Sequence, residues 1–197
     1  MPKLWNETID AHRREVRDAI LDTAAILVSE CGLRGVTMSA IAEQTGIGRA
    51  TLYKYFADVE AILAAWHERE IGWHLNELIR IAERAGAPDQ RLEAVLEAYA
   101  LRARRSHGQD ATIVAALHQG RHVTDAEQRV HLMVRELVVE AGESGSLRVD
   151  IAADELVAYC LSAVTAAEHL TSQDGVHRLI AMIMTSLRAT RNPAGVQ

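Results

Sequence analysis

The sequence predicts an all-α protein, and its composition and hydrophobic spacing both support that prediction. Aromatic residues make up only 4% of the 197 residues, whereas alanine and leucine are abundant. This balance favours helices over sheets. The three prolines, Pro2, Pro88 and Pro193, leave every segment with helical apolar spacing uninterrupted.

Three compact helices are expected first. Apolar side chains such as Val16, Ile20 and Leu27 recur at helical spacing, and Gly32 ends that run. Thr37 is well placed to cap a short second helix. A tight turn at 46–48 then leads into a third. The predicted ranges are about 10–31, 38–44 and 49–55.

Longer helices follow, which gives about nine in all. Asp58 is a predicted N-cap of the fourth helix, and Trp73 is one of its expected apolar anchors, with Ile62, Trp66 and Leu78. Thr124 with Glu127 has the capping-box pattern that opens a helix. The predicted ranges are about 59–84, 89–105, 110–119, 124–142, 152–172 and 175–190. We expect an N-terminal helix-turn-helix domain at 1–57 and a C-terminal helical domain at 58–197.

Charge is distributed unevenly along the chain. Residues 1–57 carry seven basic and seven acidic side chains, so the rest of the chain accounts for the whole net charge of −6. Contacts with phosphate depend on which face carries the cations rather than on net charge. The acidic balance is therefore compatible with DNA binding by the N-terminal domain.

Two cysteines and the lack of long apolar runs indicate the compartment. Cys31 and Cys160 have neither metal-ligand nor disulfide-framework spacing, which favours a reducing cytosol. The N-terminus does not have the pattern of a signal peptide, and no run approaches the roughly 20 apolar residues of a membrane span. A cytoplasmic protein without a membrane partner is expected.

The segment 37–56, TMSAIAEQTGIGRATLYKYF, has the pattern of a helix-turn-helix. Two short helices that cross closely need a small residue in the first and glycine at the turn, which Ala42 and Gly46 supply. Ile41, Ile47 and Leu52 would lock the second helix against the first. The alternative is an ordinary helical hairpin without a partner.

The second helix of this motif exposes side chains suited to DNA. Arg49 lies at its N-terminal end and can donate two hydrogen bonds to guanine, and Thr51 offers a hydroxyl or a methyl group. Tyr53, Lys54 and Tyr55 carry donors suited to phosphates, as does Thr37 at a helix N-terminus. The predicted DNA-binding residues are Thr37, Arg49, Ala50, Thr51, Tyr53, Lys54 and Tyr55.

Residues 10–66 resemble the DNA-binding domain of the tetracycline-repressor (TetR) family. The long first helix, the segment Gly32–Leu33–Arg34–Gly35–Val36–Thr37, then IAEQTGI and TLYKYF carry the resemblance. It implies a homodimeric repressor that binds a palindromic operator and is released by a small hydrophobic or amphipathic ligand. Two departures weaken the expected grip on the DNA backbone: Gly48 and Val59 stand where the family often has a hydroxyl residue and a lysine. Lys3, Arg13, Arg14 and Arg17 could compensate.

The resemblance also implies a ligand pocket in the C-terminal domain. Pockets are mostly apolar with a few convergent polar groups. Core packing is the alternative role for each candidate. The predicted ligand-binding residues are Trp66, His67, His74, Tyr99, Leu117, His118, Val134, Leu137, Tyr159 and Val164.

The last two helices are the candidates for dimerisation. Small residues in VAYCLSAVTAAEHL allow helices to approach closely, and the last helix has a broad apolar stripe. In the family these helices pair across the dimer as a four-helix bundle. The alternative is that the stripe faces its own core. The predicted interface residues are Tyr159, Ser162, Ala163, Ala166, Ile180, Ile183, Met184 and Leu187.

The sequence also bears on three other classes of function. Nine histidines, with His118 and His122 four apart, leave a metal-responsive regulator as an alternative, although no metal ligand is assigned. An enzyme is not expected, because the chain contains no GxSxG, phosphate-binding loop, HExxH or CxxC, and no cofactor is expected. A ligand-binding protein without DNA function would leave Arg49 and Lys54 idle.

Overall fold

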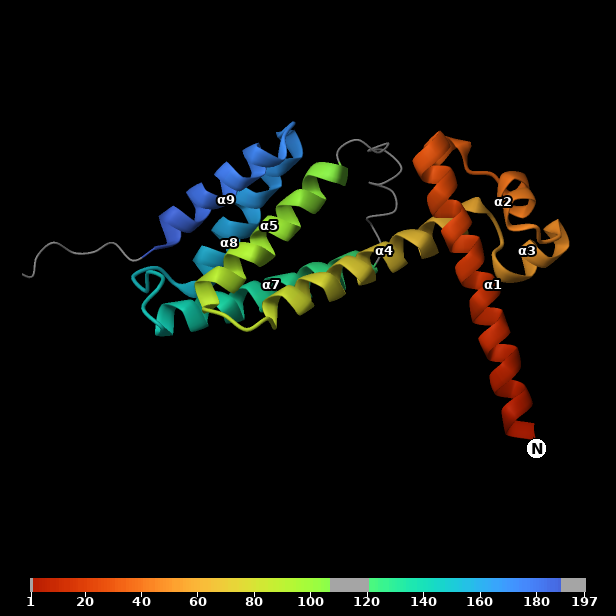
Figure 1. The fold of residues 1–197 in the computed structure, drawn as a ribbon, viewed down its shortest axis with the longest axis horizontal. Helices are drawn as coiled ribbons and strands as arrows, with labels where there is room; N and C mark the ends of the chain where they lie inside the picture. Colours follow the sequence, from red (N-terminus) through yellow and green to blue (C-terminus); the bar gives the residue numbers. More distant parts are fainter. Residues whose placement is uncertain (1, 107–120, 189–197) are drawn as a thin grey trace, which may run out of the picture. The chain divides into compact units, whose positions relative to one another are not determined.

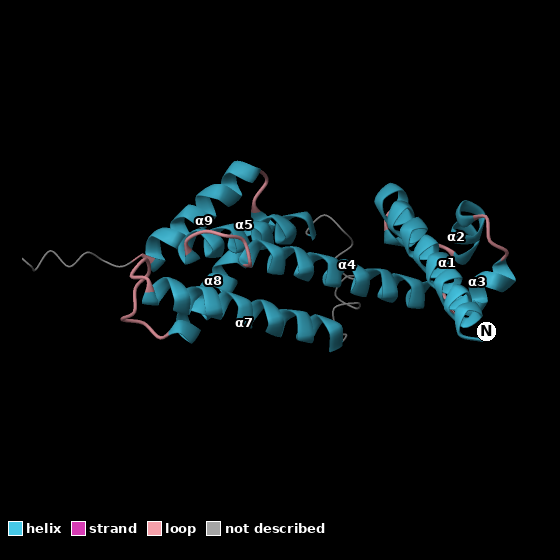
Figure 2. Ribbon diagram, turned by 60° about the horizontal axis from the view of Figure 1, so that its bottom comes forward, coloured by secondary structure: helices cyan, strands magenta, loops and turns pink. Residues whose placement is uncertain are grey.

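The computed structural model describes residues 2–106 and 121–188, with side chains for 9–104 and 124–188. Within these ranges the protein is all-helical, and Figure 2 shows helices joined by loops with no strand. This confirms the predicted fold class. The α helices are α1 (Pro2–Cys31), α2 (Met38–Thr45), α3 (Arg49–Tyr55), α4 (Val59–Ala82), α5 (Pro88–Ser106), α7 (Arg121–Glu143), α8 (Ala153–Val164) and α9 (Gln173–Leu187), and the short 3-10 helices are η1 (Leu33–Gly35) and η2 (Thr165–His169).

The chain divides into two compact units whose boundary falls inside α4 (Figure 1). Among the described residues the first unit contains 2–71 and the second contains 72–106 and 121–188. The sequence placed the boundary at 57/58, where α4 is about to begin. The structure differs because the first turns of α4 pack into the first core, through Ile62, Leu63 and Trp66.

The first unit has its own hydrophobic core, formed where α1, η1, α2, α3 and the first half of α4 meet. Ile20, Ile41, Leu52 and Ile62 are completely buried there, one from each of these α helices. Burial of a side chain of this size contributes about 1.5–3 kcal/mol. These contacts therefore fix the short helices α2 and α3, which at eight and seven residues are too short to be stable alone.

The second unit packs the second half of α4 with α5, α7, α8, η2 and α9. Its fully buried side chains include Leu92 and Leu96 of α5, Val134 of α7 and Leu187 of α9. Polar contacts at the surface also join these helices. Arg91 of α5 pairs with Glu140 of α7, and the backbone N–H of Arg148, after α7, donates to the carbonyl of Leu187 at 2.9 Å.

Several element boundaries differ from the sequence prediction. Helix α1 begins at Pro2 rather than near residue 10. Helix α7 begins at Arg121, so Thr124 lies inside it and does not cap it. The helix predicted over 152–172 is α8 up to Val164 and then the 3-10 helix η2, whose first residue, Thr165, donates its hydroxyl to the Ser162 carbonyl at 2.7 Å. The helix predicted over 110–119 lies outside the described residues.

Trp73 corrects a packing prediction. It was expected to anchor α4 but is 60% exposed and stands edge-on to His74. The helix buries Leu75 and Leu78 instead. The aromatic residue suggested a buried anchor, but the neighbouring helices cover a different face of α4.

Candidate nucleic-acid interface

The turn between α2 and α3 is built from local signals in the sequence. Thr37 Oγ1 accepts a hydrogen bond from the backbone N–H of Ala40 at 3.1 Å, which confirms it as the N-cap of α2. Gly46 ends α2 in the left-handed region, at φ 71°, and Gly48 opens α3 at φ −63°. The N-cap of α4 is also confirmed, since Asp58 Oδ1 accepts from the N–H of Ala61 at 2.7 Å.

The apolar wedge predicted between α2 and α3 is present. Ile41 and Leu52 are completely buried, Ala42 is 7% exposed, and Ile47 in the turn packs partly buried against the same core. Leu52 comes from the inner face of α3 and Ile41 and Ala42 from α2. The two helices are therefore held as one rigid element, as a recognition helix requires.

The outer face of α3 is exposed and basic. Arg49, Ala50, Thr51, Tyr53 and Lys54 are all exposed. No carboxylate occurs between residues 44 and 57, so this stretch carries two positive charges within a chain of net charge −6. The face offers donors suited to base edges and phosphates, and α3 itself carries no acidic side chain.

Two of the predicted contacts have a structural role as well. Tyr55 is half-buried against the first core, so the ring packs as part of the fold. Thr37 uses its oxygen as an acceptor in the cap, and its hydroxyl hydrogen remains able to donate to a phosphate.

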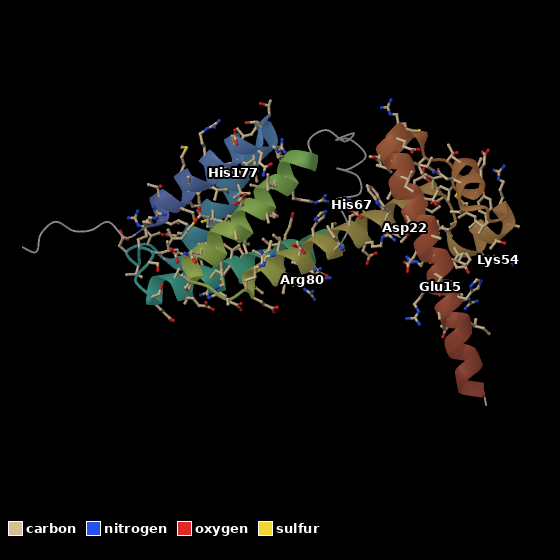
Figure 3. All side chains as sticks on the ribbon, viewed as in Figure 1. Glu15, Asp22, Lys54, His67, Arg80 and His177 are labelled. Carbon is tan, nitrogen blue, oxygen red and sulfur yellow. The ribbon has the colours of Figure 1, made fainter. Side chains whose placement is uncertain are left out.

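Arg17 of α1 connects that helix to the end of α3. Its guanidinium carbon lies 5.1 Å from the centre of the Phe56 ring, the residue that directly follows α3. A guanidinium over an aromatic face is a favourable cation–π arrangement. Figure 3 shows the side chains of this unit, with Lys54 labelled on α3 and Asp22 on α1, which pairs with Arg69 of α4 at 2.7 Å.

Comparison with known proteins gives this motif a family. Residues 20–66 match the family model described as bacterial regulatory proteins of the tetR family. Over these residues the chain is similar to the DNA-binding region of TetR-family regulators. It is 35% identical over 80 residues to the HTH-type transcriptional repressor KstR of Mycolicibacterium smegmatis, across 41% of this chain and 39% of that protein.

A second relative also matches only part of the chain. The chain is 28% identical over 96 residues to the HTH-type transcriptional regulator BetI of Rhizobium meliloti, across 49% of this chain and 44% of the relative. Each match therefore spans less than half of the relative's length. A solved structure of a transcriptional regulator from Saccharomonospora viridis, in complex with choline, shares the fold: the TM-score is 0.71 at 19% identity, over 90% of this chain and 100% of that one.

The two departures from the TetR pattern have clear structural consequences. Gly48 caps α3 without a side-chain hydrogen bond, so it supplies no hydroxyl at that helix end. Val59 is partly buried against the first core. At this position the chain gains apolar packing in place of a cation.

The predicted ligand-binding residues lie in two different cores. Trp66 and His67 are buried in the first unit at 8% exposure each. Val134, Leu137 and Val164 are buried in the core of the second unit, and Tyr99 is partly buried beside it. His74 is partly exposed beside Trp73, Tyr159 is 45% exposed, and Leu117 and His118 lie outside the described residues.

Two polar groups among these candidates are notable. Burial raises the pKa of Tyr99 above its ordinary value, and the negative charges of Glu127 and Glu168 raise it further. Its hydroxyl is therefore protonated at neutral pH and able to donate. Trp66 Nε1 is buried without a hydrogen-bond partner among the described residues.

The predicted dimer residues divide by exposure, and half of them require correction. Ile180, Ile183, Met184 and Leu187 are at most 2% exposed and pack in the core of their own unit, so the apolar stripe of α9 faces inward. Tyr159, Ser162 and Ala166 are exposed, and Ala163 is partly exposed.

Sequence reasoning missed Met182 of α9, which is 70% exposed. It lies on the outer face of α9, as does Ser186, whose hydroxyl donates to Tyr159 of α8 at 3.1 Å. Met182 and Ser186 are four residues apart and therefore share a helix face. This spacing is the sequence signal from which Met182 could have been predicted to lie on the outer face of α9.

The metal alternative receives no support from the described side chains, which contain no group of three His, Cys, Asp or Glu able to hold a metal ion. His118 lies outside the described residues, and the side chain of His122 is not described. Within the described helices none is long and apolar enough to cross a membrane.

Proposed function

We propose that this protein is a homodimeric transcriptional repressor that binds a palindromic operator and leaves it when a small hydrophobic or amphipathic ligand binds. The exposed, carboxylate-free face of α3 is the observation that carries the DNA-binding part. It presents Arg49 and Lys54 on a helix locked by the buried Leu52. The chain acts as a binding protein, like the regulators it resembles, and not as an enzyme.

The residues of this face have separate roles. Arg49 and Thr51, with Ala50 between them, contact base edges in the major groove from the N-terminal half of α3. Tyr53, Lys54 and Tyr55 bind phosphates beside them, and Thr37 binds a phosphate at the start of α2. Base contacts set the sequence preference, whereas phosphate contacts set affinity and its salt dependence.

The dimer uses the outer face of α8 and α9. Several exposed residues there are small or apolar: Ser162 on α8, Ala166 on η2 and Met182 on α9, with Tyr159 of α8 hydrogen-bonded to Ser186 of α9. Small residues let a second copy of the helices approach closely. Two recognition helices related by a two-fold axis then bind half-sites about one DNA turn apart, roughly 34–36 Å or a multiple of it.

The ligand acts through α4. This single helix contributes Ile62 and Trp66 to the first core and Leu75 and Leu78 to the second. A ligand that displaces the second half of α4 therefore moves the first half with it and changes the spacing of the two α3 helices in the dimer. Tyr99 is the donor that we assign to polar atoms of the ligand, beside the apolar Val134, Leu137 and Val164 of the same unit. The complex of the Saccharomonospora viridis regulator with choline supports a small-molecule ligand for this fold.

The test is selection of random duplex DNA by the purified protein, with Arg49→Ala as the matched variant. The wild type is expected to enrich a palindrome. The variant is expected to lose about 1–3 kcal/mol of binding free energy and to show a weaker base preference at one base pair in each half-site. A folded, dimeric wild type that enriches no sequence would overturn the proposal, and an unchanged preference in the variant would remove Arg49 from base reading.

A further inference from the structure

Helix α1 is much longer than its packing requires. It begins at Pro2, yet among its described side chains, from Ile9 onward, the first to join the core are the partly buried Val16 and the buried Ile20. Ile9 is 42% exposed, and residues 12–15 are all exposed. Figure 1 shows these N-terminal turns of α1 extending past α2 and α3 of the same unit. At 1.5 Å per residue, the turns before Val16 add roughly 20 Å of helix.

Three exposed arginines lie on one side of these turns. Arg17 is followed on its helix face by the buried Ile20, Leu21 and Ala24, at spacings of three, four and seven residues. Arg13 and Arg14 precede Arg17 by four and three residues, so they continue that same face beyond the core. The face that packs into the first core thus becomes basic where the described packing ends. Asp10 is the acidic residue on this face, whereas Asp22 lies on another face and pairs with Arg69.

The position of this face relative to α3 follows from Arg17. Its guanidinium lies over the Phe56 ring, one residue after the end of α3. Stacking uses the flat face of a guanidinium and leaves its N–H edge free to point outward, which is the edge that binds phosphate oxygens. Arg17 is therefore held beside the C-terminal end of α3, where the chain packs against α1.

We propose that the N-terminal turns of α1 form a second DNA-contacting surface, in which Arg13, Arg14 and Arg17 bind phosphates that flank the base pairs contacted by α3. This inference rests on the proposed function and extends its footprint. The occupant is a nucleic-acid backbone because the surface offers guanidinium groups and adjoins, through Arg17 and Phe56, the end of α3 that carries Lys54. The extra cations also offset the lysine that Val59 replaces. The contacts carry no sequence information, because every nucleotide presents the same phosphate.

The experiment compares the wild type with Arg13→Gln/Arg14→Gln on the selected palindrome. Both side chains are exposed, so the double variant should fold, and circular dichroism checks this. Affinity is expected to fall by the same factor for all DNA sequences, and the base preference stays unchanged. The slope of log affinity against log salt should flatten by about 0.9 for each lost contact, or about 3.6 for four contacts in the dimer.

Two controls separate a local contact from general charge. Arg129→Gln changes the charge at an exposed arginine of α7, in the second unit, and should leave the salt slope unchanged. Duplex length gives a second readout. The wild type should bind a palindrome extended by several base pairs at each end more tightly than the bare palindrome, and the double variant, which keeps Arg17, should show a much smaller preference.

The outcomes are distinct. A wild type that selects no DNA overturns the proposed function and this surface with it. A wild type that binds its palindrome with the same salt slope and duplex-length preference as the double variant overturns this surface alone. An equal loss of slope in Arg129→Gln would also overturn it, since the effect would then come from net charge.

Discussion

Gly46, in the turn between α2 and α3, offers a test of how backbone conformation supports the recognition helix. It has φ 71°, and no other atom lies within 4 Å of where a Cβ would be placed. Gly46→Ala therefore creates no clash, and its effect comes from the backbone alone. An L-residue in the left-handed region costs about 1–2 kcal/mol. Alanine also lowers the conformational entropy of the unfolded chain, which stabilises the folded protein by about 0.4–1 kcal/mol. The free energy of unfolding is therefore expected to fall by about 1 kcal/mol.

Gly48, two residues later, is the matched control. It has an equally open Cβ position, but its φ is −63°, a conformation that any residue adopts. The gain of about 0.4–1 kcal/mol from restricting the unfolded chain is offset by the poorer N-capping of alanine. The free energy of unfolding of Gly48→Ala is therefore expected to lie within about 0.5 kcal/mol of the wild-type value.

Urea denaturation followed by the fluorescence of Trp66 is the assay, because Trp66 is buried in the same core as α2 and α3. Trp5 and Trp73 are replaced by phenylalanine in all samples to isolate this signal. Gly46→Ala should unfold at a lower urea concentration with an unchanged slope. Equal midpoints for the two alanine variants would refute the argument that the left-handed turn residue must be glycine.

Three further predictions concern single groups. Tyr55→Phe should weaken binding to all DNA sequences alike, measured by salt titration; a loss confined to one base pair would contradict a phosphate contact. Ala166→Glu should shift the dimer toward monomer in light scattering, because it puts a carboxylate on the proposed interface, and an unchanged mass would exclude that face. Cys31 is exposed and should react with a thiol reagent at pH 8, whereas burial raises the pKa of Cys160 to about 12, so Cys160 should react only after unfolding. Below pH 9.0, the ordinary pKa, the Cys160 thiol is protonated in both states, and from there to about pH 12 only the unfolded thiol ionises, so the free energy of unfolding should fall over that range.

The helix-turn-helix could be predicted because its signals are local. The cap at Thr37, the turn at Gly46 and the apolar spacing of Ile41 and Leu52 act within a few residues of one another. They hold whichever way the rest of the chain packs. The exposure of Arg49 and Lys54 follows from the same spacing, since a helix that buries Leu52 turns its other faces outward.

The faces of the later helices were decided by tertiary packing. The sequence shows that α9 has an apolar stripe, but not whether Ile180 and Met184 face their own core or a partner; α5 and α8 cover them, and Met182 is left outside. The residue type of Trp73 suggested an anchor, yet none of the described helices covers its side of α4, where it is 60% exposed. The boundary between the two units likewise lies inside α4 and not before it, because the first turns of α4 pack in the first core. Periodicity determines that a helix has an apolar face, whereas the neighbours that the whole chain brings together determine what that face contacts.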